Sequence, residues 1–163
     1  MYRTGIGFDV HPLVIDKPLI IGGVKIPHTH GLLGHSDADV LIHAIIDGIL
    51  GALALGDIGT HFPDTNAKYR GVDSLSLLAR VHNMAKERGF ICSNIDTIIM
   101  AQEPKMNPQI SKMRKNLSEV LMLGFDEVSI KATTTENLGF IGRKEGIAAQ
   151  AIVLYQSVKK SLV

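Results

Sequence analysis

The sequence has no tryptophan and a single cysteine among its 163 residues. Cys92 therefore cannot form a disulfide within the chain, which excludes the class of small secreted proteins that disulfides stabilise. One unpaired cysteine is typical of a protein from a reducing compartment, so we expect a cytoplasmic location. Cys92 lies in an apolar segment, where we expect it to be a small core residue.

A large excess of charge of either sign is also missing, since the formal net charge is +1. Without a basic field, we expect no nucleic-acid partner and no binding to an anionic membrane. The most apolar stretch, Val40–Leu55, contains His43 and Asp47 and is shorter than the ~20 residues that a membrane-spanning helix requires. Hydrophobic residues make up 45% of the chain, enough for a core, so we expect a single domain over residues 1–163 with no membrane partner.

The stretch from His35 to His43 begins after a glycine turn and continues into this apolar segment. We predict a helix over residues 39–54, with Ser36 or Asp37 as its N-cap, because a short side-chain oxygen accepts from the free amides of a first turn. Polar residues recur every four positions, at Asp39, His43 and Asp47, and so share one face of this helix. His43, flanked by carboxylates, is then either a metal ligand or simply a hydrogen-bonded, partly buried histidine.

A second group of metal-binding side chains lies near the N-terminus. Residues 3–11 have strand character, and side chains two apart in a strand point to the same face, so Asp9 and His11 lie together. With His43 they form a set of three ligands, and zinc sites that perform chemistry keep three protein ligands and one open position. Aspartate and histidine also pair without a metal, so the spacing alone leaves both interpretations open.

The remaining segments predict an α+β fold with a mixed β-sheet and helices on one face. We expect a hairpin over residues 19–26 with a turn at Gly22-Gly23, strands over 91–101 and 128–133, and helices over 74–88 and from about 104–108 to 123. Residues 55–73 show no sustained period and form a long loop, which is either a plain connector or a functional loop. Residues 146–158 carry both helix and strand signals. Five or six strands with one helical layer leave an open sheet face, which indicates an oligomer.

Thr133-Thr134-Thr135-Glu136 follows one of these strands and offers three hydroxyls and a carboxylate. Hydroxyls and backbone amides at a strand end are donors suited to phosphate oxygens, although threonine is also simply common in strands. A carboxylate beside phosphates suits magnesium, which takes hard oxygen ligands. Lys105 and Arg143 are either phosphate partners or solvated surface charges.

Six short blocks occur in order along nearly the whole chain: Gly7-Phe8-Asp9-Val10-His11, His35-Ser36-Asp37-Ala38-Asp39 with His43, Asp57-Ile58-Gly59, Phe62-Pro63-Asp64-Thr65, Ala101-Gln102-Glu103-Pro104-Lys105-Met106, and Ala132-Thr133-Thr134-Thr135-Glu136. In these blocks the sequence resembles the 2-C-methyl-D-erythritol 2,4-cyclodiphosphate synthases of the non-mevalonate isoprenoid pathway. The resemblance implies that residues 146–158 form a strand. It also implies a homotrimer whose core packs the open sheet faces, with active sites between subunits.

The resemblance further implies a role for each matched residue. Zn²⁺ is held by Asp9, His11 and His43, and Mg²⁺ or Mn²⁺ by Glu136 with substrate phosphates. His35 and Ser36 contact phosphate, and His35 and Thr134 stabilise the transition state. Asp57, Ile58 and Gly59 hold the methylerythritol hydroxyls. Asp9 and His11 also belong to the substrate-binding set. Its other residues are Phe62, Pro63, Asp64, Thr65 and Asn66 in the neighbouring loop, Ala101, Gln102, Glu103, Pro104, Lys105, Met106 and Asn107 around the cytosine, and Thr133, Thr135, Phe140 and Arg143.

The activity implied is cyclisation of 4-diphosphocytidyl-2-C-methyl-D-erythritol 2-phosphate with release of CMP, a metal-assisted phosphorus–oxygen lyase reaction. Two other functions use the same features. A metal-dependent phosphodiesterase or pyrophosphatase would activate water with the same ligands. A non-catalytic binder of prenyl diphosphate or nucleotide would leave the three metal-binding side chains without a role.

Overall fold

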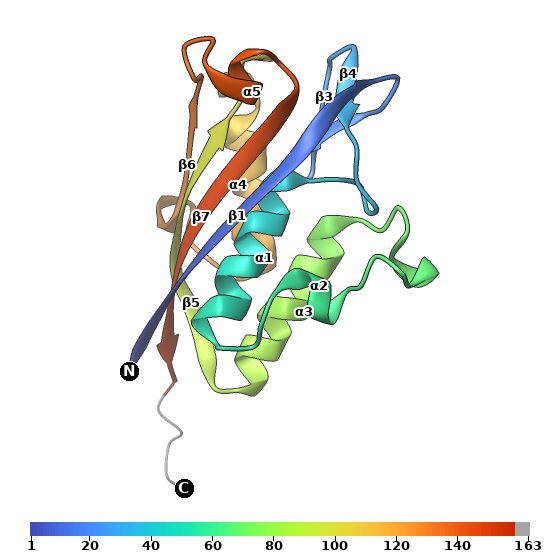
Figure 1. The fold of residues 1–163 in the computed structure, drawn as a ribbon. Helices are drawn as coiled ribbons and strands as arrows, with labels where there is room; N and C mark the ends of the chain where they lie inside the picture. Colours follow the sequence, from blue (N-terminus) through green and yellow to red (C-terminus); the bar gives the residue numbers. More distant parts are fainter. Residues whose placement is uncertain (159–163) are drawn as a thin grey trace, which may run out of the picture.

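The computed structural model describes residues 1–158, which form strands, α-helices and two short 3₁₀ turns (Figure 1). The strands are β1 (Tyr2–Ile15), β2 (Leu19–Ile21), β3 (Val24–Ile26), β4 (His30–Leu32), β5 (Phe90–Met100), β6 (Val128–Thr133) and β7 (Gly146–Ser157). The α-helices are α1 (Val40–Ala52), α2 (Ile58–His61), α3 (Ser74–Glu87), α4 (Asn107–Leu121) and α5 (Gly139–Gly142). The 3₁₀ turns are η1 (Ala67–Tyr69) and η2 (Phe125–Glu127).

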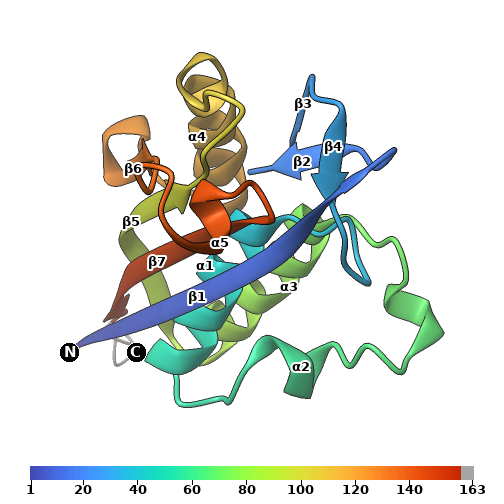
Figure 2. The ribbon, with the colours of Figure 1, turned by 45° about the horizontal axis from the view of Figure 1, so that its top comes forward.

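Five strands form one mixed sheet in the order β4-β1-β7-β5-β6, and β2 pairs with β3 in a separate hairpin. The β5–β6 pair is parallel, whereas β1–β4, β1–β7 and β5–β7 are antiparallel. The long helices α1, α3 and α4 lie on the same side of the sheet (Figures 1 and 2). The α+β class and the one-sided helical layer predicted from the sequence are therefore confirmed.

Helix α1 is the centre of the core. Apart from Asp47 and Gly51, each of its residues is buried, and it packs against β1, β7 and α3. A helix that is apolar on all sides is stable only when neighbours cover it completely, and the sheet and α3 provide that cover. The lone Cys92 is 8% exposed and part of this core, as its apolar surroundings predict.

Several sequence-based boundaries need correction. β1 extends to Ile15, and residues 55–73 are not plain loop, since they contain α2 and η1. Residues 1–158 contain seven strands, because β4 forms within the segment expected to be a loop. The hairpin at Gly22-Gly23 is confirmed. The two glycines have φ angles of 61° and 68°, in the left-handed region that glycine adopts without steric cost. The segment from Gly146 is a strand, because β1 and β5 pair with it on both sides.

The sheet face opposite the helices is rich in exposed apolar side chains. Tyr2, Ile6, Phe8 and Val10 alternate along β1 with residues that face the helices, and each is exposed. Ile6 pairs with Ile152 of the neighbouring β7, which is 50% exposed, so the apolar surface continues across strands. A contiguous apolar surface of this kind is typical of a protein–protein contact. No helix within residues 1–158 is long and apolar enough to cross a membrane.

Candidate active site

Two glycines of β1 allow α1 to approach the sheet closely. A Cβ atom on Gly7 would lie 1.9 Å from the carbonyl oxygen of Ala44, and one on Gly5 would lie 1.9 Å from that of Gly48. Only glycine fits at such positions, because the clash is with helix backbone that cannot rotate away. This close contact places His43, the neighbour of Ala44, beside the strand residues that follow Gly7.

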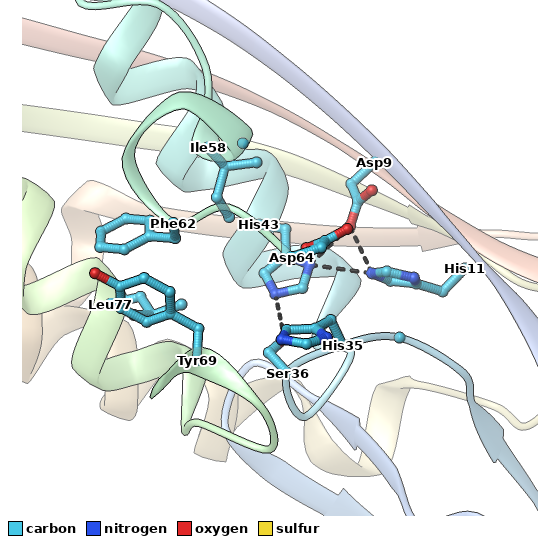
Figure 3. Close-up of a pocket in the computed structure, with 12 residues that line it drawn as sticks. Asp9, His11, His35, Ser36, His43, Ile58, Phe62, Asp64, Tyr69 and Leu77 are labelled. Carbon is cyan, nitrogen blue, oxygen red and sulfur yellow. Dashed lines mark hydrogen bonds and ion pairs between the residues drawn. The ribbon is translucent and has the colours of Figure 1, made fainter. Parts of the chain in front are cut away.

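The three predicted metal ligands meet where β1 passes α1 (Figure 3). Asp9 Oδ2 lies 3.0 Å from His11 Nε2 and 3.0 Å from His43 Nδ1, and the two ring nitrogens are 3.0 Å apart. A tetrahedral zinc ion with bonds of about 2.0 Å holds its ligand atoms about 3.3 Å apart. Two nitrogens and one carboxylate oxygen at nearly that spacing fit zinc, whose fourth position would remain open.

These three groups also shift one another's acidity. Burial on its own would raise the pKa of Asp9, but hydrogen bonds and charge interactions with His11 and His43 lower that pKa well below its usual range. Burial likewise would lower the pKa of His43, whereas the hydrogen bond to Asp9 and the nearby carboxylates raise it. The group of three therefore favours a cation, which is either a proton on the imidazole or a metal ion.

The N-cap of α1 is Asp39, so the prediction of Ser36 or Asp37 was wrong. Asp39 is fully buried, and it accepts from the amides of Gly22 and Gly23 as well as from Ile42 in the first turn. Local sequence rules do not include the amides of Gly22 and Gly23. Residue 39 is the better cap because its carboxylate satisfies these amides as well as the first turn of α1. Burial raises the pKa of Asp39 to about 6, against the lowering effect of these amides.

His35 and Ser36 therefore precede the helix by several residues, too far for the positive end of its dipole to help them bind an anion. Asp47, on the helix face of His43, accepts from the amide of Ile58 at 2.7 Å and so ties α2 to α1. Burial raises the pKa of Asp47.

A cavity of about 370 Å³ opens beside the metal ligands (Figure 3). Of the predicted site residues, it is lined by Asp9, His11, His35, Ser36, His43, Ile58, Gly59, Phe62 and Asp64. His35 Nε2 is buried and makes no hydrogen bond within residues 1–158, which leaves a polar atom to be satisfied at this cavity. Asp57 and Asn66 instead cap α2 and η1, and neither they nor Pro63 and Thr65 line the cavity.

The segment predicted to surround a cytosine lines a second, separate cavity of about 180 Å³. Its lining comprises Ala101, Gln102, Pro104, Lys105, Met106, Asn107, Ala132, Thr133 and Thr134. Within this chain, the two groups of predicted substrate-binding residues are therefore not brought into one pocket. Glu103 does not line this cavity, and its carboxylate pairs with Lys144 at 2.7 Å.

The threonine hydroxyls are already engaged as donors. Thr133 Oγ1 donates to the carbonyl of Thr134, and Thr135 Oγ1 donates to that of Leu138. Thr134 Oγ1 donates to Glu136 Oε1 at 2.9 Å. The exposed Glu136 therefore lies beside the three threonines and outside the group of Asp9, His11 and His43. Phe140 and Arg143 are exposed outside both cavities, and Arg143 pairs with Glu145.

Several residues of the site were missed from the sequence. Gly34, Tyr69 and Leu77 line the first cavity, and Ser74 contacts His43 Nε2 at 3.0 Å. Ser74 begins α3, and no local pattern relates that position to a histidine of α1. The Ser74 hydroxyl is fully buried beside a charged partner, which is a signal that only the folded chain provides.

Comparisons with known proteins agree with this geometry. A protein from Alkaliphilus metalliredigens named 2-C-methyl-D-erythritol 2,4-cyclodiphosphate synthase is 62% identical over 98% of this chain and 99% of its own length. The structure of the bifunctional IspDF from Campylobacter jejuni matches with a TM-score of 0.93 and 45% identity, covering 97% of this chain and 43% of that longer one. A CDP complex of IspF from Plasmodium falciparum matches with a TM-score of 0.84 and 36% identity over 96% of each chain. The YgbB family model matches residues 2–156, and the chain therefore belongs to the YgbB family.

Proposed function

We propose that this chain is a 2-C-methyl-D-erythritol 2,4-cyclodiphosphate synthase, the name carried by relatives that match more than nine tenths of its length. An oxygen of the substrate's 2-phosphate attacks the β-phosphorus of the cytidyl diphosphate. The bond from that phosphorus to the bridging oxygen breaks, and CMP leaves with the bridging oxygen. The observation that carries the proposal is the group of Asp9, His11 and His43 at the edge of a cavity that His35 also lines.

Asp9, His11 and His43 hold zinc, and Glu136 holds Mg²⁺ or Mn²⁺ together with substrate phosphates. The two nitrogens of the first group suit zinc, and the lone carboxylate of the second suits a hard ion that keeps phosphate and water ligands. Bound cations would supply positive charge that offsets the repulsion between two anionic phosphates.

No protein group needs to act as a general base. The nucleophile is a phosphate monoester whose second pKa is about 6, so it is largely dianionic at neutral pH. The protein's task is instead to orient two phosphates and stabilise the charge of the transition state. We assign this stabilisation to His35 and Thr134, and phosphate binding to Ser36. The unsatisfied, buried His35 Nε2 supports the assignment.

Three segments recognise the rest of the substrate. Residues 57–59 hold the methylerythritol hydroxyls, and residues 62–66 bind the substrate from the neighbouring loop. Residues 101–107 hold the cytosine through main-chain groups, with Lys105 and Arg143 near the phosphates. The cavity beside residues 101–107 supports the assignment of the cytosine, and the CDP complex of the relative from P. falciparum supports a cytidine diphosphate as the ligand.

We infer a cytoplasmic homotrimer of single-domain subunits, with active sites between neighbours. Two features support association of several copies with sites between them. The exposed apolar side chains on the open sheet face need a partner, and a second copy offers a matching apolar surface. The metal-ligand cavity and the cavity at residues 101–107 are separate in one chain, so a neighbour would complete each site.

The reaction is tested by incubating the protein with the cytidyl substrate and zinc and magnesium salts, and by identifying the products by mass. Cyclisation yields CMP and a cyclic diphosphate that carries no oxygen from ¹⁸O-labelled water. A hydrolase would incorporate the label, and that result would refute the proposal. The purified protein should contain about one zinc per chain, and His43→Ala should lose it. Full zinc content in that variant would exclude the assigned ligand set.

The assembly is tested by sedimentation and by mixing two inactive variants. If each site combines groups from two chains, then reassembling His43→Ala with Thr134→Ala should restore part of the activity. A fully active monomer in sedimentation would contradict the assembly.

A further inference from the structure

Behind the metal-ligand group, His43 contacts two serines. Its Nε2 atom lies 3.0 Å from Ser36 Oγ and 3.0 Å from Ser74 Oγ, on the opposite side of the ring from Asp9 and His11. The two serines differ in their surroundings. Ser74 is fully buried and bonds to the carboxylate of Asp37, whereas Ser36 lines the cavity and has no carboxylate partner within residues 1–158.

The donors and acceptors around Asp37 fix the direction of this chain of hydrogen bonds. Asp37 Oδ2 accepts from the backbone amide of Ser74 at 3.0 Å, and Oδ1 accepts from that of Asp39 at 3.3 Å. An ionised carboxylate can only accept, so the hydroxyl of Ser74 donates its single proton to Asp37 Oδ1. Ser74 Oγ must then accept from His43 Nε2. In the neutral imidazole, which is the form that binds a metal ion, the one ring proton therefore lies on Nε2 and the lone pair of Nδ1 faces Asp9 and His11.

We propose that Ser74 and Asp37 are positioning residues that hold the His43 ring in the orientation and tautomer needed to bind metal through Nδ1. Ligating histidines are usually fixed in this way by a hydrogen bond from their other nitrogen. Because Ser74 Oγ accepts the hydrogen bond from Nε2–H, the hydroxyl of Ser36 remains available to a ligand in the cavity. The two serines thus have different roles despite equal distances from His43. This inference rests on the proposed zinc site.

Ser74→Ala tests the proposal, because it removes the hydroxyl and leaves the backbone amide that bonds to Asp37. Zinc affinity is measured without substrate, by competition with a chromophoric chelator. Loss of an outer partner of a metal ligand should weaken zinc binding by about 10- to 100-fold. The matched control is Ser36→Ala, for which zinc affinity should stay within about threefold of wild type while the KM for the cytidyl substrate rises.

Asp37→Asn provides a second variant of nearly the same shape. Its side-chain amide can donate to Ser74 Oγ, which frees the serine proton to turn toward His43 Nε2 and favours the wrong tautomer. Zinc affinity should again fall by about tenfold or more. The absorption spectrum of bound Co²⁺ should also change in both variants, since it reports ligand geometry.

Unfolding of the metal-free variants separates this role from a purely structural one. If Ser74 only stabilises the start of α3, the Tm falls while zinc affinity stays at the wild-type value, and the proposal is refuted. It is equally refuted if Ser36→Ala weakens zinc binding as much as Ser74→Ala, or if the wild-type protein binds no zinc. Zinc binding with the expected order of variants but without cyclisation would refute the proposed reaction and leave this inference standing.

Discussion

Gly7→Ala is the sharpest test of how the fold builds the site. The added Cβ would lie 1.9 Å from the carbonyl oxygen of Ala44 and 2.7 Å from the amide nitrogen of Gly48. These backbone atoms would have to retreat by about 1.5 Å before the contact became an ordinary one. Inserting one methyl group into a packed core usually costs about 1–3 kcal/mol, and we expect about 3 kcal/mol or more because no side chain can rotate aside.

The same displacement should disrupt metal binding. Asp9 follows Gly7 by two residues on β1, and His43 precedes Ala44 on α1, so separating strand from helix separates the ligands. Zinc tolerates changes of only about 0.2 Å in its ligand distances, and we expect at least a tenfold loss of affinity. Urea denaturation of the metal-free protein measures the first effect, and chelator competition measures the second.

Gly51→Ala is the matched control, because Gly51 lies in α1, the helix that Gly7 of β1 contacts. Its Cβ would meet nothing closer than 3.9 Å, and replacing a helical glycine with alanine should stabilise the protein by about 0.5–1 kcal/mol. Wild-type stability and zinc affinity in Gly7→Ala would refute the argument that this close approach assembles the site.

Three further predictions concern single side chains. Asp39→Ala should lower the free energy of unfolding by about 3 kcal/mol, because buried amides of the hairpin turn and of α1 lose their acceptor. Urea denaturation measures this loss, and a loss below about 1 kcal/mol would contradict the prediction. The raised pKa of His43 contributes stability to the metal-free protein that is present below pH 6.5 and is lost as the pH rises through the folded-state pKa. Zinc binding strengthens over the same rise in pH because protons no longer compete with zinc for the His43 ring. The Tm difference between zinc-loaded and EDTA-treated protein should therefore widen with pH. A constant difference would exclude this linkage. Asp64→Asn should retain an acidic limb of kcat near pH 6, the second pKa of the substrate phosphate; disappearance of that limb with zinc content intact would identify Asp64 as a general base.

Local sequence rules were sufficient for the elements whose signals are periodic. The spacing of Asp9 and His11 placed both on one face of a strand, and the apolar run around His43 indicated a buried helix. Both signals survive in the structure because strand and helix periodicity are properties of the backbone itself. The glycine pair at residues 22 and 23 likewise determined a hairpin, since its φ angles are open to glycine.

The tertiary structure decided which polar groups meet. Asp39 caps α1 because its carboxylate also satisfies amides of a hairpin distant in sequence. Ser74 reaches His43 only because α3 packs against α1. The segment 101–107, apart from Glu103, lines a cavity away from the metal ligands because β5 carries it to another part of the sheet. The sequence by itself identified Asp9, His11 and His43 as candidate metal ligands, together with the elements that carry them. Their convergence within 3.0 Å, the burial of Asp39 and the contact with Ser74 required the folded chain, because hydrogen bonds between distant segments depend on packing rather than on local spacing.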